Sequence, residues 1–216
     1  MQVDLFCRTL REKLSGRIVK IQNETDFFAA AVVLPLLVEN GGLSVLFEVR
    51  SAQLAWQPGE ICFPGGRIEA GDAEPEQAAV RETYEELMLA PDGLQLLGPL
   101  DYLVSPIGVI IYPFAGYIAD PTTIRPSADE VAAVFTVPLR FFLETEPLAA
   151  QMEVATRPLP GFPVELVAAG YPPDWRRRAA YPVLFYRYGE HVIWGLTARI
   201  MYSFAEICRA INVGTV

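Results

Sequence analysis

Three glutamates at helical spacing are the residues in this sequence best suited to chemistry. Glu82, Glu85 and Glu86 would project from neighbouring positions on adjacent turns of a helix. Mg²⁺ is held in proteins by a few carboxylate oxygens, with water and substrate phosphate completing its shell. The spacing therefore predicts a divalent-metal site. A solvated acidic face of a surface helix would have the same pattern.

A glycine pair precedes the glutamates. Gly65 and Gly66 predict a turn whose backbone can approach a ligand closely, because no side chains stand in the way. A helix is expected over residues 75–88, where a proline occupies the first helical position.

One arginine is placed to join the loop to this helix. Arg81 can reach an acid of the preceding loop, either Asp72 or Glu69, and compensate part of the negative charge. The chance that a solvated surface would also carry a glycine pair, a loop acid and this arginine is low. The joint pattern favours the metal-site interpretation.

These residues together resemble the signature of the Nudix hydrolase family. That signature is a glycine, a loop acid, then Arg-Glu, two further residues, Glu-Glu and commonly a glycine. It is matched here by Gly66, Asp72, Arg81, Glu82, Glu85 and Glu86. Two departures are visible: Asp72 replaces the usual glutamate and lies one residue farther from the arginine, and Met88 stands where glycine is common.

The flanking sequence is similar to the coenzyme A pyrophosphatase branch of that family. The longer spacing with Asp72 is typical of the branch, and so is the run from Arg50 to Gly66, in which Gln57 replaces a frequent histidine. Further similar segments are residues 129–131, 137–139 and 193–198.

The resemblance implies an α/β (α+β) fold, the family's α/β/α sandwich with a mixed β-sheet. It implies a site for Mg²⁺ or Mn²⁺ with Glu86 and Glu85 as principal ligands. Glu82 would be a further ligand or the base that activates water, and Glu130 is a second candidate base or else a solvent-facing loop acid. Arg81 would support the catalytic site.

The implied reaction is hydrolysis of the phosphoanhydride bond of coenzyme A or its derivatives, giving 4'-phosphopantetheine and 3',5'-ADP. Gly65 and Gly66 would lie against this substrate, and Arg50 and Arg67 are candidate phosphate contacts. The triple arginine at 176–178 is another candidate, or an exposed loop. ADP-ribose, NADH or another nucleoside diphosphate derivative is the alternative substrate, and a non-catalytic nucleotide-sensing module is the alternative of another class.

The elements expected to position these residues alternate between helix and strand. Apolar, β-branched runs separated by turn residues predict strands at 28–38, 43–49, 94–103, 109–118, 152–156, 164–168 and 184–188. Amphipathic spacing predicts helices at 3–15, 75–88, 137–144 and 194–211. The Asn40-Gly41 pair between the first two strands predicts a hairpin.

Composition limits the classes of partner and compartment. The 216 residues form one expected domain, 1–216, and 26 acidic against 17 basic residues argue against nucleic-acid binding. Three scattered cysteines fit no disulfide framework, no signal peptide is visible, and prolines and glycines interrupt the uncharged stretch 102–119. We expect a soluble cytoplasmic protein without a membrane span, whose apolar C-terminal helix could support a homodimer.

Overall fold

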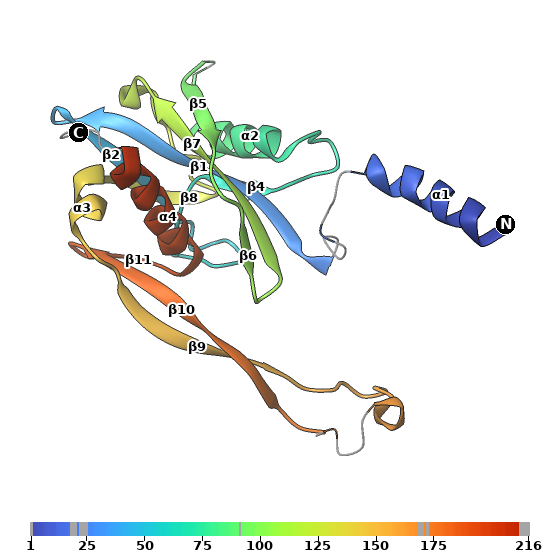
Figure 1. The fold of residues 1–216 in the computed structure, drawn as a ribbon. Helices are drawn as coiled ribbons and strands as arrows, with labels where there is room; N and C mark the ends of the chain where they lie inside the picture. The colour runs from blue at the N-terminus through green and yellow to red at the C-terminus, as the bar shows by residue number, and fades with distance from the viewer. Residues whose placement is uncertain are drawn as a thin grey trace.

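The computed structural model describes residues 2–17, 21, 26–90, 92–167, 171 and 173–211. It has an eight-stranded mixed sheet between helices and a separate three-stranded antiparallel sheet that extends from the body as an arm (Figure 1). The helices are α1 (Gln2–Ser15), α2 (Pro75–Leu87), α3 (Leu139–Glu144) and α4 (Gly195–Ile211). The arm consists of β9 (Leu148–Thr156), β10 (Arg176–Tyr188) and β11 (His191–Trp194).

The main sheet is built on a hairpin and one parallel pair. Its strands are β1 (Phe28–Glu39), β2 (Gly42–Arg50), β3 (Ile61–Cys62), β4 (Gly65–Arg67), β5 (Leu94–Pro99), β6 (Leu103–Ser105), β7 (Val109–Ile118) and β8 (Val131–Pro138). Asn40 and Gly41 both have positive φ, which the tight turn between β1 and β2 requires, so the predicted hairpin is confirmed. β1 and β7 run parallel, with Val33 beside Phe114.

The glycine turn is inserted between the two strands of this hairpin. β7 occupies one edge of β1 and β8 occupies one edge of β2 along most of their lengths. The pairs formed by β3 with β2 and by β4 with β1 therefore lie on the inner edges, where the two strands diverge. This arrangement brings the segment 61–67 into the middle of the sheet, beneath α2.

Helices cover both faces of the sheet, because side chains alternate along each strand. On one face Ala31 and Val33 of β1 pack against Ala78 and Ala79 of α2. On the other face a larger core packs β1 and β2 against α3 and α4, with Phe47 at its centre. The expected α/β/α sandwich with a mixed sheet is confirmed.

Several expected elements differ in extent. The strand expected at 94–103 is divided into β5 and β6 after Pro99, a residue that cannot donate a hydrogen bond to a neighbouring strand. The strand expected at 164–168 is wrong where described: Val164–Leu166 forms a 3-10 helix after Pro163, and residue 168 lies outside the described residues. The arginines at 176–178 begin β10 rather than lying in a loop.

The terminal helices differ in how they pack. The α1 helix forms as predicted, but its apolar side chains, including Phe6 and Leu10, are exposed. In contrast, Ile200, Met201 and Phe204 of α4 are buried inside the chain, so this face is not available to a second copy. Among the described helices, none is long and apolar enough to cross a membrane.

Candidate active site

The packing of α2 decides where each of its glutamates points. Thr83 and Leu87 are buried against the sheet, and Glu86, next to Leu87, is only 3% exposed. The side chain of Glu82, one turn earlier, is 15% exposed, whereas that of Glu85 is 57% exposed. The three glutamates of the motif therefore divide into two inward side chains and one outward side chain.

The two glycines of the turn are required by these inward carboxylates. The backbone N–H of Gly65 donates a hydrogen bond of 2.7 Å to Oε2 of Glu86. A Cβ atom on Gly66 would collide with the carboxylate of Glu82, and one on Gly65 would collide with the backbone of Ala31 and Val32. The turn thus lies directly against the acidic face of α2, as the glycine pair predicted.

Arg81 ties the preceding loop to the helix. One of its terminal nitrogens lies 3.1 Å from Asp72, and the other lies 2.8 Å from Glu82 and 3.3 Å from Glu85. The hydrogen bond from Arg81 is the main reason that the pKa of Asp72 is lowered. Of the two loop acids considered, Asp72 makes this contact, while Glu69 donates its backbone N–H to Asp72.

A loop distant in sequence brings a third carboxylate to the site. The backbone N–H groups of Arg125 and Ser127 donate 2.8 Å hydrogen bonds to the carbonyls of Leu87 and Glu86, which the end of α2 leaves without helical partners. Three residues beyond Ser127, the turn before β8 presents Glu130. The end of α2 therefore anchors the loop that supplies this acid.

Glu82, Glu86 and Glu130 converge into one cluster. Each offers a carboxylate oxygen, and these three atoms all lie within 4.8 Å of one another. Burial raises the pKa of Glu86 to about 7 against the Gly65 hydrogen bond, and Glu82 and Glu130 raise it further. Burial also raises the pKa of Glu82, although Arg81 opposes it. Charges crowded in this way call for a compensating cation, and a set of hard oxygen donors suits Mg²⁺ or Mn²⁺.

Glu85 lies outside this cluster. Its carboxylate is mostly exposed and contacts Arg81, four residues earlier on the same helix. Of the three ligands expected from the sequence, Glu82 and Glu86 thus face Glu130, and Glu85 faces solvent.

A fourth buried acid was not singled out from the sequence. Glu48 of β2 is 1% exposed, and burial followed by the neighbouring Glu86 raises its pKa to about 9. The signal available was a single acid inside the apolar run Leu43–Val49, directly after Phe47.

The candidate phosphate-binding arginines lie at different distances from the cluster. Arg50 is close enough to lower the pKa values of Glu48 and Glu86 against the larger effect of burial, and its Nε donates to the carbonyl of Trp56. Arg67 ends β4, with its guanidinium 5.6 Å from the ring centre of Phe28. Both belong to the elements that surround the glycine turn.

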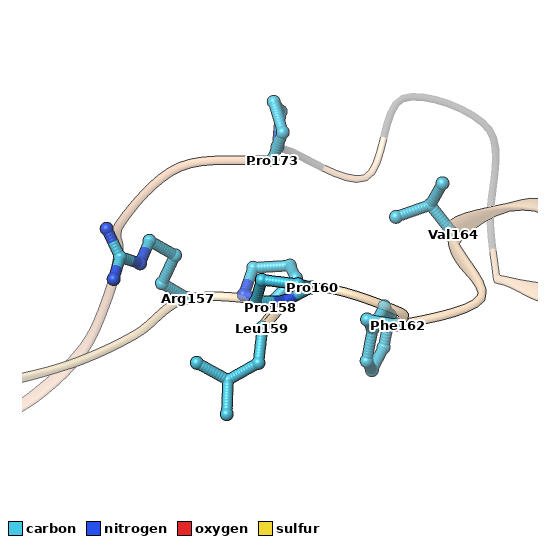
Figure 2. Close-up of a pocket in the computed structure, with 7 residues that line it drawn as sticks. All are labelled: Arg157, Pro158, Leu159, Pro160, Phe162, Val164 and Pro173. Atoms are coloured by element: carbon cyan, nitrogen blue, oxygen red, sulfur yellow. The ribbon is translucent and has the colours of Figure 1, made fainter.

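The triple arginine belongs to the arm. Arg177 pairs with Glu153 at 3.0 Å, and Arg178 donates to Thr156 and Tyr171. Figure 1 shows the arm running away from the body that carries α2. A hollow of about 450 Å³ near its tip is lined by prolines, apolar side chains and Arg157 (Figure 2), and it contains no carboxylate among the described residues.

His191 and Cys62 are placed as packing residues rather than as catalytic groups. His191 stacks on Phe135 with 3.7 Å between ring centres, as expected for a residue used in packing. Burial raises the pKa of Cys62 to about 12, which keeps it a thiol rather than a reactive thiolate.

Comparison with known proteins decides the family. The family model described as the NUDIX domain matches residues 27–154, which include the whole cluster and the glycine turn. The chain belongs to the NUDIX family. The matched segment contains the main sheet and α2, and the family expected from the sequence, the Nudix hydrolases, is confirmed.

Relatives include proteins of the expected branch. A peroxisomal coenzyme A diphosphatase of Mus musculus, NUDT7, is 37% identical over 116 residues, 54% of this chain and 49% of that protein. A mitochondrial coenzyme A diphosphatase of Homo sapiens, NUDT8, is 29% identical over 91% of this chain and 74% of its own length. An uncharacterized Nudix hydrolase, NudL, of Pectobacterium atrosepticum is 31% identical over 82% of this chain and 80% of its own length. The similarity to the mouse protein therefore spans about half the length of each chain.

Proposed function

We propose that this Nudix hydrolase cleaves the phosphoanhydride bond of coenzyme A or its derivatives, releasing 4'-phosphopantetheine and 3',5'-ADP, with Mg²⁺ or Mn²⁺ as cofactor. The observation that carries the proposal is the convergence of Glu82, Glu86 and Glu130 beside the Gly65 turn. The similarity to the coenzyme A diphosphatases supports the choice of substrate.

Glu82 and Glu86 are the residues that would hold the cation, with Glu130 beside them. A bound divalent ion would neutralise diphosphate charge and make a water easier to deprotonate. Glu85, the other ligand expected from the sequence, would have to exchange its contact with Arg81 before it could join.

Two carboxylates are candidates for the base that accepts the water proton. Glu82 is held by Arg81 at 2.8 Å, so its carboxylate is already engaged with a side-chain cation. Glu130 is exposed at the edge of the cluster, where water can reach it. These contacts favour Glu130 as the base and Glu82 as the ligand.

Backbone and guanidinium groups supply the substrate contacts in this proposal. The turn of Gly65 and Gly66 lies directly against the Glu82 carboxylate and β1, and its backbone would lie against the substrate beside the acidic cluster. Arg50 and Arg67 lie on the strands next to this turn, where a guanidinium can bind a phosphate through two hydrogen bonds.

A substrate panel tests the proposal. The purified full chain would be incubated with Mg²⁺ or Mn²⁺ and, separately, with coenzyme A, ADP-ribose, NADH and a diadenosine polyphosphate, beside a Glu86→Gln control. Release of 3',5'-ADP from coenzyme A that is lost in the control is expected. Faster cleavage of another compound would make that compound the substrate in place of coenzyme A. No cleavage of any of the four compounds would favour a nucleotide-sensing module.

We further propose a single domain over 1–216 and a cytoplasmic location. A homodimer stays a proposal that would have to use a surface other than the buried face of α4. Light scattering on the purified chain would measure the oligomeric state.

A further inference from the structure

Glu48 lies on the face of β2 that carries the metal-site helix. Side chains at alternate positions share a strand face, so Glu48 lies on the same side as Leu46, which packs against Leu87 of α2. One step along that face, Glu48 comes next to Glu86, the neighbour of Leu87, within hydrogen-bonding reach of its carboxylate. The packing of α2 on β2 thus sets two carboxylates side by side.

One oxygen of the Glu48 carboxylate is buried without a hydrogen-bond partner among the described residues. Glu48 is 1% exposed, and its Oε1 atom has no hydrogen-bond partner among the residues that the structure describes. Its neighbours in the sheet are Cys62 on β3 and Val134 on β8. Glu86, the group it faces, is 3% exposed and already accepts the Gly65 hydrogen bond. Two ionised carboxylates buried side by side cost free energy unless a positive charge lies between them.

The nearest fixed positive charge is engaged elsewhere. Arg50 acts electrostatically on Glu48, yet its Nε donates to the carbonyl of Trp56. Arg81, the other arginine of the site, pairs with Asp72, Glu82 and Glu85. At the inner end of the cluster, the oxygen donors therefore have no matching side-chain cation among the residues that the structure describes.

We propose that Glu48 ligates a divalent cation jointly with Glu86, so that the metal centre reaches inward from Glu82 and Glu130 to β2. Two observations carry this inference: the cluster of the Glu82, Glu86 and Glu130 carboxylates, and the buried, partnerless Oε1 of Glu48, whose carboxylate lies beside that of Glu86. Carboxylate oxygens are the donors that Mg²⁺ and Mn²⁺ accept. The inference rests on the proposed function, since it enlarges the same metal centre.

Direct measurement of Mn²⁺ binding tests this role without relying on activity. The full chain, stripped with EDTA, would be titrated with Mn²⁺ alone by calorimetry, and bound Mn²⁺ would be followed by electron paramagnetic resonance. Glu48→Gln keeps the shape and the hydrogen-bonding capacity of the side chain but removes its charge. Glu48→Met removes the charge and the hydrogen-bonding capacity. Glu86→Gln is the benchmark, and Glu76→Gln, an exposed acid in the first turn of α2, is the matched control.

Both Glu48 variants should bind Mn²⁺ at least about 10-fold more weakly than the parent, since even partners that only orient a metal ligand contribute about 10- to 100-fold. The Glu76→Gln control should bind like the parent. Circular dichroism and unfolding in EDTA would show that both variants fold, and an unchanged or raised stability is expected because a buried acid is removed.

The outcomes separate this inference from the proposed function. A parent chain that binds no Mn²⁺ would overturn both. Binding in the parent that Glu86→Gln weakens and Glu48→Gln leaves unchanged would overturn only the role of Glu48. Retained affinity in Glu48→Gln with loss in Glu48→Met would also overturn it, because Glu48 would then only position Glu86 through a hydrogen bond.

Discussion

The backbone N–H of Gly65 donates a 2.7 Å hydrogen bond to Oε2 of Glu86, joining the glycine turn to the carboxylate that is central to the acidic cluster. The contact depends on the conformation of Gly65, whose φ is +147° and whose missing side chain leaves room for Ala31 and Val32. Turn, strand β1 and helix α2 are thus held together at Gly65, and this contact fixes where the Glu86 carboxylate lies in the acidic cluster.

Gly65→Ala should therefore destabilise the protein strongly. We expect a loss of about 3 kcal/mol in the free energy of unfolding, from backbone strain together with the collision against β1. Gly41→Ala is the matched control, since Gly41 also has positive φ but open space around it. It should cost about 1 kcal/mol. Urea unfolding in EDTA measures both, and equal losses would contradict a special role for the packing at Gly65.

The division between inward and outward glutamates predicts unequal effects of substitution. Glu86→Gln removes a buried member of the cluster and should lower kcat/KM by about 100-fold or more, whereas Glu85→Gln should lower it by about 10-fold or less. Steady-state kinetics at saturating Mg²⁺ compares them. If Glu85→Gln is as damaging as Glu86→Gln, Glu85 changes partner when metal binds and is a principal ligand.

Arg81 and Asp72 should be energetically coupled. Their 3.1 Å contact joins an arginine side chain that is 30% exposed to an aspartate side chain that is only 8% exposed. A double-mutant cycle with Arg81→Gln and Asp72→Asn, measured by urea unfolding in EDTA, should give a coupling of about 1 kcal/mol. If the losses in unfolding free energy of the two single variants add up to that of the double variant to within about 0.3 kcal/mol, the pair does not hold the loop.

The metal-free protein should lose stability as pH rises. Burial raises the pKa values of Glu48 to about 9 and of Glu86 to about 7, above their ordinary value of 4.5. A raised carboxyl pKa means that the folded state keeps a proton that the unfolded chain releases. The stabilisation is complete below 4.5 and is lost as pH rises towards 7 for Glu86 and 9 for Glu48.

Each such group contributes a slope of at most about 1.4 kcal/mol per pH unit within its window. Urea unfolding in EDTA from about pH 5 to about pH 9 measures this slope. Glu48→Gln should flatten the curve above about pH 7, where Glu48 is the one of these two carboxyl groups that still titrates. A parent curve as flat as that of the variant would refute the protonated state of Glu48.

The end of α2 offers a stabilising substitution. Met88, which stands where the family commonly has glycine, adopts the left-handed conformation with φ of 47° and is 59% exposed. Met88→Gly should raise the free energy of unfolding by about 1 kcal/mol, because glycine adopts this conformation without strain. Met88→Ala keeps the strain and is the control. A destabilised Met88→Gly would indicate that the methionine side chain contributes packing that outweighs the strain.

Local sequence determined the elements and the composition of the site. The apolar, β-branched runs of β1 and β2, the Asn40-Gly41 turn and the helical spacing of the glutamates each depend on residues close together in the chain. Propensity, turn conformation and side-chain period act over that range, so these features could be predicted. The contact between Arg81 and Asp72 was predictable for the same reason, since nine residues separate the pair.

Tertiary structure decided which acids meet. Whether Glu85 or Glu86 faces inward depends on which side of α2 packs on the sheet, and one helical step separates the two outcomes. Glu130 and Glu48 reach the cluster from a turn and a strand far away in the sequence. Helical spacing within α2 carries no information about such approaches, because they follow from the burial of apolar faces across the whole sheet. The sequence by itself determined that carboxylates would form the site, and packing decided which carboxylates belong to the acidic cluster.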